Sequence, residues 1–296
     1  MTPCVQCPRA CGVEREGERI GFCGVPAAFR VARASLHLWE EPFLSGERGS
    51  GTVFFSGCNL QCVFCQNREI SRGRLGRDID AGRLEEIFFA LRDAGAHNLN
   101  LVTPTHYAKQ LTPVLERVKP KLGIPIVYNC SGYESLETLK ELRGLIDVYL
   151  PDVKYYSSEL SQKYSGVSDY FSVAHAALRE MIDQVGAPRF APDGMLESGV
   201  VVRHLVLPGA RQDSLALLTE LHRSFGSRAF LLSLMNQYTP EFALECPYPE
   251  LHRRLTTFEY QSVLKRAEAL CFEGCVQGRE AASAAYTPDF YERSFL

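Results

Sequence analysis

The chain has 296 residues, of which 46% are apolar and 23% are charged, and its formal net charge is −3. This composition excludes a largely disordered chain, and without a basic excess nucleic acid is not an expected partner. No apolar run is long enough to span a bilayer and the first residues lack an apolar signal segment, so we expect a cytoplasmic protein with no membrane partner.

From about residue 50 onward, short apolar segments alternate with amphipathic ones. In chain order, the pattern predicts strands at Thr52–Ser56, Asn98–Val102, Ile124–Asn129, Ile146–Leu150, Val200–Leu207 and Ala229–Met235. It predicts helices at Asp78–Ala94, Gln110–Leu122, Ser135–Leu145, Tyr170–Gln184, Ser214–Phe225 and Thr256–Ala269. Apolar strands interleaved with helices indicate an α/β fold with a parallel sheet, either an open doubly wound sheet or an incomplete barrel.

Two regions lie outside this alternation. Residues 1–44 contain four cysteines and little regular pattern, so we expect a small cysteine-rich module there. Residues 187–199 are rich in proline and glycine, which predicts a loop. We therefore expect three parts: the module at 1–44, the α/β part at 45–240, and a C-terminal helix and tail at 241–296.

Three cysteines, Cys58, Cys62 and Cys65, directly follow the first predicted strand. In parallel α/β folds, ligand sites lie at this end of the strands. Clustered thiols in a reducing compartment indicate metal or redox chemistry rather than disulfides. Three thiolates within eight residues can hold one four-iron cluster and leave one iron open, as in a catalytic metal centre. A three-cysteine zinc site is the alternative.

Four more thiols lie near the start of the chain: Cys4, Cys7, Cys11 and Cys23. Together they would close a coordination shell. Tetrahedral zinc would make this group a structural centre, whereas an auxiliary [4Fe-4S] cluster would relay electrons or contact the substrate. Soft thiolates suit both metals, so both alternatives stay open.

The remaining cysteines are expected to pack as small apolar side chains rather than to form a further metal site: Cys130, Cys246, Cys271 and Cys275. The spacing of Cys271 and Cys275 predicts that they share one face of the last helix.

The three-cysteine loop resembles the signature of the radical S-adenosylmethionine (SAM) superfamily, Cys-x3-Cys-x-aromatic-Cys, with Phe64 as the aromatic residue. The surrounding sequence resembles the pyruvate formate-lyase-activating-enzyme-like branch in the segments CPRACGVER, WEEP, LVTPTHY, VYNCSGYE, YLPDVKYY, RHLVLPG and LSLMNQYTP. The resemblance implies a partial (β/α)6 barrel with the cysteine-rich module before it and a helical extension after it. It also implies a [4Fe-4S] cluster on Cys58, Cys62 and Cys65. SAM would chelate this cluster and be cleaved reductively to methionine and a 5′-deoxyadenosyl radical.

The resemblance suggests which side chains contact SAM. Phe64 would pack near the adenine, and Asn129 and Ser131 would lie at the level of the ribose or carboxylate. Arg203 would hold the SAM carboxylate, because a charge within an otherwise apolar strand needs an anionic partner. Asp152 and Lys154 resemble the Asp-x-Lys pair of glycyl-radical activating enzymes, with a purely structural ion pair as the alternative.

One position departs from the family pattern. Many relatives carry Gly-Gly-Glu at the end of the second strand, where this chain has Val-Thr-Pro-Thr-His at residues 102–106. Thr103, Thr105 and His106 would then make the cofactor contact in a different way. His106 has the alternative of a hydrogen bond to backbone at the strand end.

Three functions are compatible with these features. The first is a radical SAM oxidoreductase that installs a glycyl radical on a partner glycyl-radical enzyme, with a flavodoxin- or ferredoxin-like reductant. The second is direct modification of a small molecule, another protein or a peptide, which the four-cysteine segment and the missing Gly-Gly-Glu favour. The third is a non-catalytic iron–sulfur or zinc protein, against which TPTHY and Arg203 argue.

Overall fold

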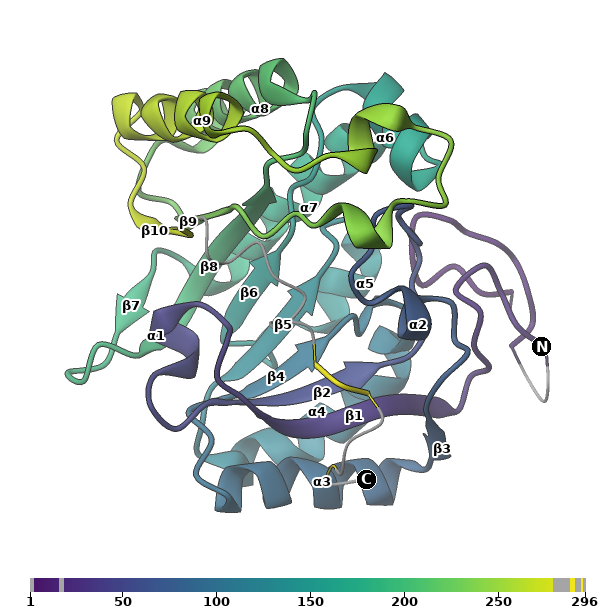
Figure 1. The fold of residues 1–296 in the computed structure, drawn as a ribbon. Coiled ribbons are helices and arrows are strands. Elements are labelled where there is room, and N and C mark those ends of the chain that lie inside the picture. The colour runs from purple at the N-terminus through teal and green to yellow at the C-terminus, as the bar shows by residue number, and fades with distance from the viewer. Residues whose placement is uncertain (1–2, 16–18, 279–287, 291–293, 295–296) are drawn as a thin grey trace.

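The fold is built on a curved, mostly parallel β-sheet (Figure 1), seen in a computed structural model that describes residues 3–15, 19–278, 288–290 and 294. The parallel strands, in spatial order, are β10 (Gly274–Val276), β9 (Leu231–Met235), β8 (Leu196–Leu205), β6 (Val148–Pro151), β5 (Ile126–Cys130), β4 (Leu99–Val102) and β2 (Ser50–Phe55). The antiparallel strands are β1 (Phe29–His37) and β3 (Arg77–Ile79), beyond β2, and β7 (Arg189–Phe190), beside β8. Within the described residues the edge strands β10 and β3 do not pair, so the sheet is not closed into a barrel. The predicted α/β fold with a partial barrel is confirmed.

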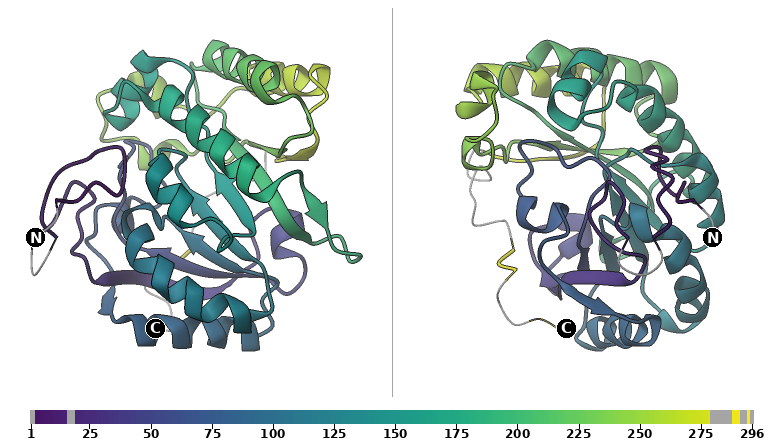
Figure 2. Two further views of the ribbon diagram at one scale, coloured as in Figure 1. Left: turned by 180° about the vertical axis from the view of Figure 1, so that it is seen from behind. Right: turned by 90° about the vertical axis from the view of Figure 1, so that its right-hand side faces the viewer.

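A layer of helices covers one face of the sheet, which is the near face when the molecule is seen from behind (Figure 2). They are α3 (Ala81–Asp93), α4 (Ala108–Leu122), α5 (Leu136–Glu141), α7 (Tyr170–Val185), α8 (Arg211–Phe225) and α9 (Thr257–Ala269). Their apolar sides and the strands enclose the main core, so burial of apolar surface fixes the sheet against this layer. The short helices of the connections are α1 (Pro42–Ser45), α2 (Arg68–Ser71) and α6 (Ser158–Ser165), with 3-10 turns at Thr105–Tyr107, Pro240–Phe242 and Pro249–His252.

Local sequence explains where several helices begin. The side chain of Asp80 accepts a hydrogen bond from the Arg83 backbone N–H at the start of α3. Thr256 and Glu259 form a capping box at the start of α9, in which each side chain bonds the other residue's backbone N–H. These bonds satisfy N–H groups that lack partners within the helix.

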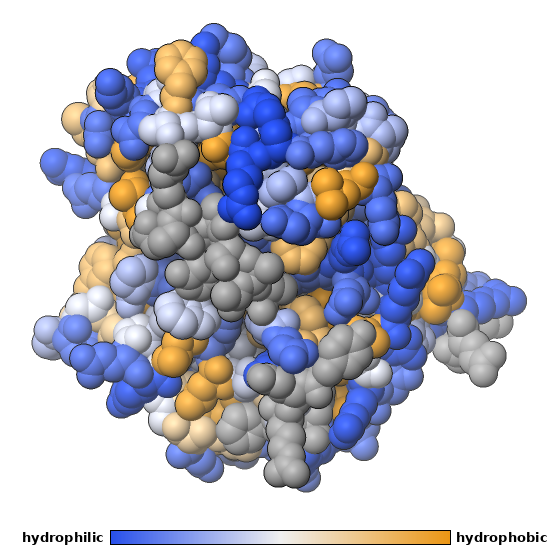
Figure 3. Space-filling view, in the orientation of Figure 1, coloured by the Kyte–Doolittle hydropathy of each residue, from blue (hydrophilic) through white to orange (hydrophobic). Residues whose placement is uncertain are grey.

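The surface on one side is mainly hydrophilic, with apolar side chains scattered among polar ones (Figure 3). Across the described part of the chain, no helix combines the length and apolar character that a membrane crossing requires.

The structure corrects the sequence interpretation in three places. Strand β1 lies in the segment that was expected to be irregular, and it pairs with β2. Strand β7 and the start of β8 occupy part of the loop that was predicted at 187–199. A further helix, α6, was not predicted.

The prediction that Cys271 and Cys275 share a helix face is also wrong. Helix α9 ends at Ala269, Cys271 has a φ of 57°, and Cys275 lies on β10. The chain leaves the helix because it turns to pair with β9 at Gly274, where a Cβ would lie 2.0 Å from the Leu232 carbonyl oxygen.

Candidate functional site

The carboxyl ends of the parallel strands surround a cavity of about 750 Å³. Its wall includes two cysteines of the loop after β2, polar residues at the ends of β5, β6 and β9, a residue of β8, and the connection between β1 and α1. Sites for small organic ligands have volumes in this range, and parallel sheets bind ligands at this end of their strands. The cavity is therefore the candidate functional site.

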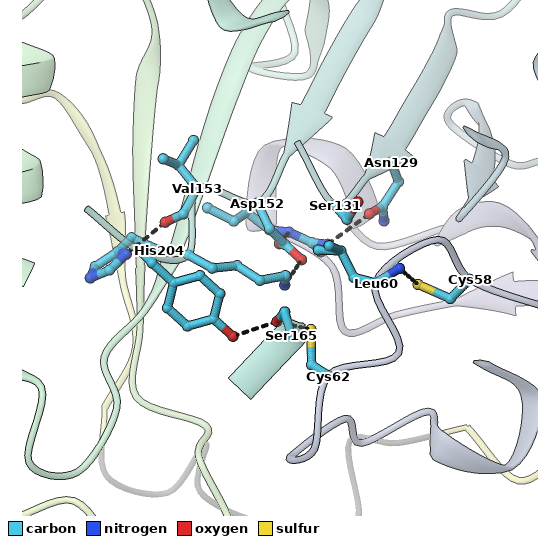
Figure 4. Close-up of polar contacts among 12 residues, drawn as sticks. Cys58, Leu60, Cys62, Asn129, Ser131, Asp152, Val153, Ser165 and His204 are labelled. Atoms are coloured by element: carbon cyan, nitrogen blue, oxygen red, sulfur yellow. Dashed lines mark hydrogen bonds and ion pairs between the residues drawn. The ribbon is translucent and has the colours of Figure 1, made fainter. Parts of the chain in front are cut away.

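The three-cysteine loop begins at Gly57, which directly follows β2 and the buried Ser56. Cys62 and Cys65 line the cavity. The Ser165 hydroxyl donates a hydrogen bond of 2.9 Å to the Cys62 sulfur, and the Leu60 backbone N–H lies 3.4 Å from the Cys58 sulfur (Figure 4). The first bond orients a sulfur atom from outside the loop, and the second orients one from within it.

The loop thiols are half-buried and close to one another. Burial and, second to it, the neighbouring Cys62 raise the pKa of Cys58 to about 11 and that of Cys65 to about 12, whereas Lys154 acts in the opposite direction. Such thiols ionise readily only when a metal binds them.

The donor set fits a cluster better than one ion. Within the described residues, no three His, Cys, Asp or Glu side chains are gathered tightly enough to hold a single metal ion. A four-iron cluster is wider than one ion, and its ligands stand farther apart. Three soft thiolates beside a cation suit an iron–sulfur cluster.

A network of half-buried charged side chains forms the wall opposite the loop. The Arg203 guanidinium donates to Asp152 at 2.9 Å, to Asn129 at 2.7 Å and to Glu40 at 3.3 Å. The Lys154 ammonium lies 2.6 Å from the second oxygen of Asp152 (Figure 4). All five side chains line the cavity, so strands β5, β6 and β8 and the β1–α1 connection each contribute a polar group.

The network keeps its central carboxylate ionised. Burial alone would raise the pKa of Asp152, but Arg203 and Lys154 outweigh it and hold that pKa below its usual value. Burial would lower the pKa of Lys154, yet Asp152 raises it above its usual value. The Asp152–Lys154 ion pair considered from the sequence is present. It remains charged at neutral pH, facing the cavity.

Two carboxylates of this site were missed in the sequence, Glu40 and Glu41. Burial raises the pKa of both, while Arg203 opposes that rise. Glu41 is only 7% exposed, and one of its oxygens has no hydrogen-bond partner within the described part of the chain. In the sequence they appear only as two adjacent acidic residues in the segment WEEP. They belong to this site because of a contact with β8, more than 150 positions away, and the sequence does not indicate that contact.

Phe64 also lines the cavity. Its ring packs edge-on against three tyrosines, Tyr155, Tyr164 and Tyr238, with centroid distances of 6.2 to 6.5 Å. This aromatic cluster fixes the ring beside Cys65, so a flat apolar surface is presented next to the loop thiols.

The structure does not place four of the predicted cofactor contacts on the cavity wall: Thr103, Thr105, His106 and Ser131. Thr105 donates to Glu134 at 2.8 Å, and Ser131 donates to the Asn59 side chain at 3.2 Å. The His106 Nε2 lies 2.7 Å from the Ser56 carbonyl oxygen, to which it donates, so the backbone bond considered for this residue is present. Ser131 therefore contacts the loop and His106 contacts the residue before it, whereas Thr105 bonds Glu134.

The four cysteines at the start of the chain are brought together elsewhere. Cys4, Cys7, Cys11 and Cys23 line a second, much smaller cavity of about 10 Å³, on the other side of the three-cysteine loop at Asn59.

Two sequence comparisons bear on this site. The family model of the radical SAM superfamily matches residues 52–187, which include the three-cysteine loop, Asn129, Asp152 and Lys154. An uncharacterized protein of Methanocaldococcus jannaschii is 31% identical over 280 residues, which cover 90% of this chain and 74% of that protein.

Two solved structures have a similar fold. Streptococcus suis SuiB bound to the precursor peptide SuiA has a TM-score of 0.51 at 14% identity, over 75% of this chain and 46% of that one. Methylornithine synthase (PylB) has a TM-score of 0.50 at 19% identity, over 74% of this chain and 60% of that one. At these identities the likeness establishes a shared fold, and the two enzymes' substrates do not transfer to this chain.

Proposed function

This chain belongs to the radical SAM superfamily, and from that premise we propose that it removes a hydrogen atom from a glycine of a partner protein, as an activating enzyme does. The superfamily implies a [4Fe-4S] cluster and SAM, whose reductive cleavage supplies a 5′-deoxyadenosyl radical when both are bound. A one-electron donor of the flavodoxin or ferredoxin class would complete the reaction.

The observation that carries the proposal is the meeting of the loop thiols with the Asp152–Lys154 ion pair at one cavity. Cys62 and Cys65 line it together with that pair, and Lys154 is close enough to lower the pKa of Cys58 and Cys65. We assign cluster binding to Cys58, Cys62 and Cys65. Lys154 offsets their negative charge, and the pair matches the Asp-x-Lys pattern of glycyl-radical activating enzymes.

Other wall residues would position SAM. Phe64 offers a flat surface to the adenine, and Asn129 and Arg203 offer an amide and a guanidinium to the ribose and carboxylate. Because Thr103, Thr105, His106 and Ser131 lie behind the wall, they would act as positioning residues for the loops that carry these groups.

A second candidate function is direct modification of a small molecule or a peptide. Glu40 and Glu41 favour it, because they add to the wall the buried carboxylate of Glu41 and that of Glu40, whose side chain is 9% exposed. Polar groups at fixed places in a cavity select among small ligands by hydrogen bonding.

Transfer of deuterium separates the two candidates. The anaerobically reconstituted enzyme is given SAM, a strong reductant and a synthetic peptide whose central glycine carries deuterium on its α-carbon. A matched peptide carries α-deuterated alanine at that position. We expect deuterium in 5′-deoxyadenosine only with the glycine peptide. Formation of 5′-deoxyadenosine without deuterium from the glycine peptide would contradict glycine as the substrate, and no 5′-deoxyadenosine at all would contradict the radical chemistry.

A further inference from the structure

The four cysteines at the start of the chain share one small cavity. Cys4, Cys7, Cys11 and Cys23 line it, and it has room for about one water molecule. The Cys4 and Cys11 side chains are near enough to interact electrostatically. A Cβ at Gly21 would lie 2.9 Å from the Cys11 sulfur and 4.0 Å from the Cys23 sulfur. Residues separated by up to 19 positions are therefore folded around one point.

Backbone N–H groups lie near these sulfurs: that of Arg9 is near the Cys7 sulfur, and those of Val13 and Phe22 are near the Cys11 sulfur. Residues 3–15 and 19–28 contain no helix or strand, so no regular hydrogen-bond ladder holds this segment in shape. Hydrogen bonds to sulfur stabilise thiolates and tune metal centres that thiolates ligate.

Two arginines beside the cavity, the buried Arg15 and the half-buried Arg9, have no anionic partner among the described residues. Arg9 donates to the carbonyl oxygens of Asn59, Ser165 and Gly166. Arg15 is 5% exposed and donates to the carbonyl oxygens of His106 and Pro26, and its Nε has no partner. Neither forms an ion pair with any carboxylate in the described ranges. A buried guanidinium without an anion is unfavourable.

The positive charge of these two arginines calls for an anionic group at the cavity. Four thiolates around a doubly charged metal centre carry two negative charges, which matches two arginines.

We propose that Cys4, Cys7, Cys11 and Cys23 bind a second metal centre with four thiolate ligands, whose charge is offset by Arg9 and Arg15. Zinc and a [4Fe-4S] cluster share this ligand chemistry. The sulfurs are not gathered within reach of one ion as they stand, and the same is true of the three-cysteine loop. Binding therefore draws the four side chains inward. This inference does not depend on the reaction proposed for the larger cavity.

The second centre is a fixed neighbour of the three-cysteine loop. The Cys58 backbone N–H donates to the Cys23 carbonyl oxygen at 3.2 Å, and the Gln61 side chain donates to the Phe22 carbonyl oxygen at 2.7 Å. The Arg9 Nε donates to the Asn59 carbonyl oxygen at 2.9 Å. The backbone that holds the second centre therefore also holds the back of the catalytic loop.

Metal analysis tests the site directly. A variant with Cys58, Cys62 and Cys65 all changed to alanine keeps only the proposed second site, and iron, zinc and acid-labile sulfide are counted per chain. We expect about one zinc without sulfide, or about four irons with four sulfides, and either result supports the site. A folded variant that retains neither metal overturns it. Circular dichroism and a Cys271→Ala variant with the loop intact serve as controls.

A second variant tests the role assigned to Arg9. In the intact protein, Arg9→Met is expected to speed release of the second metal to a chelator by about tenfold or more, because partners that support a ligand shell contribute that much to metal affinity. Arg19→Met is the matched control, since Arg19 lies in the same segment and its side chain is 72% exposed. Equal release from the two variants would contradict the charge assignment. Neither measurement requires SAM cleavage, so both tests are independent of the proposed function.

Discussion

The two cysteine-lined cavities balance charge in opposite ways. In the large cavity, both cations are paired with carboxylates, Arg203 with Asp152 and Glu40, and Lys154 with Asp152. In the small cavity, the hydrogen bonds that Arg9 and Arg15 donate all go to carbonyl oxygens among the described residues. The first wall is nearly neutral before anything binds, whereas the second carries unbalanced positive charge.

The difference in size points the same way. About 750 Å³ is enough for an organic ligand beside the loop thiols, whereas about 10 Å³ leaves no space for one. A wall with balanced charge can admit and release ligands of several charge states. A closed pocket with excess positive charge suits one permanent anionic centre. We infer that the large cavity is where catalysis takes place. The small cavity holds in position the three-cysteine loop on which catalysis depends.

The largest expected effect follows from removing one loop thiol. Cys62→Ala leaves two thiolates, which are too few to hold a four-iron cluster with one iron open, so formation of 5′-deoxyadenosine should fall at least 100-fold. The four N-terminal cysteines are untouched, and the metal of the second centre should remain. Chromatography of the nucleoside product and metal analysis measure both. Cys271→Ala, at an exposed position outside both groups, is the control.

If Cys62→Ala retained activity, the loop would not be the catalytic centre. If the variant lost the second metal as well, metal binding at the small cavity would depend on the three-cysteine loop. The separate roles assigned to the two cavities would then be wrong.

The features that could be predicted from the sequence are those that neighbouring residues determine. Each buried strand or helix shows its own pattern of apolar residues, and Cys58, Cys62 and Cys65 all lie within one loop. Strand β1 was missed because its partners, β2 and β3, set its burial from outside the segment. Glu40 was missed for the same reason, since its partner Arg203 is 163 positions away.

The dependence of the loop on the N-terminal segment can be measured at Gly57. This residue has a φ of 90°, and a Cβ there would lie 2.7 Å from the Cys23 carbonyl oxygen and 3.1 Å from the His106 Nε2. Gly57→Ala therefore adds a steric clash to the backbone strain, and we expect it to lower the free energy of unfolding by about 3 kcal/mol. Denaturant titration of the metal-loaded protein measures the change.

Gly95→Ala isolates the backbone part of that effect. Gly95 has nearly the same φ, 92°, but a Cβ there would meet nothing within 4 Å. Its substitution should destabilise by only about 1 kcal/mol. Equal losses at the two glycines would mean that the close approach between Cys23 and the loop does not contribute to stability.

The smallest effect concerns the wall between the two cavities. Glu134 follows β5 at a place where its ionisation would act on Cys7, and the neighbouring Tyr133 carbonyl accepts a hydrogen bond from Asn59. Burial raises the pKa of Glu134 to about 8, against the opposing hydrogen bonds from Thr105 and Tyr128. The folded protein then keeps this proton up to about pH 8, whereas the unfolded chain loses it near pH 4.3.

Between those two pH values the unfolded state binds fewer protons than the folded state, so this group lowers the stability as the pH rises, by up to roughly 1.4 kcal/mol per pH unit. Glu134→Gln cannot ionise, and its unfolding free energy should fall less steeply between pH 6 and 8 than that of the unchanged protein. Urea titrations at several pH values measure the slopes, with Glu137→Gln, an exposed position on α5, as control. Parallel profiles for the unchanged protein and Glu134→Gln would mean that Glu134 is ionised at neutral pH. The wall would then carry a negative charge close to Cys7. The small cavity would, like the large one, have an ionised carboxylate near its cations, and the contrast between the two cavities would be wrong.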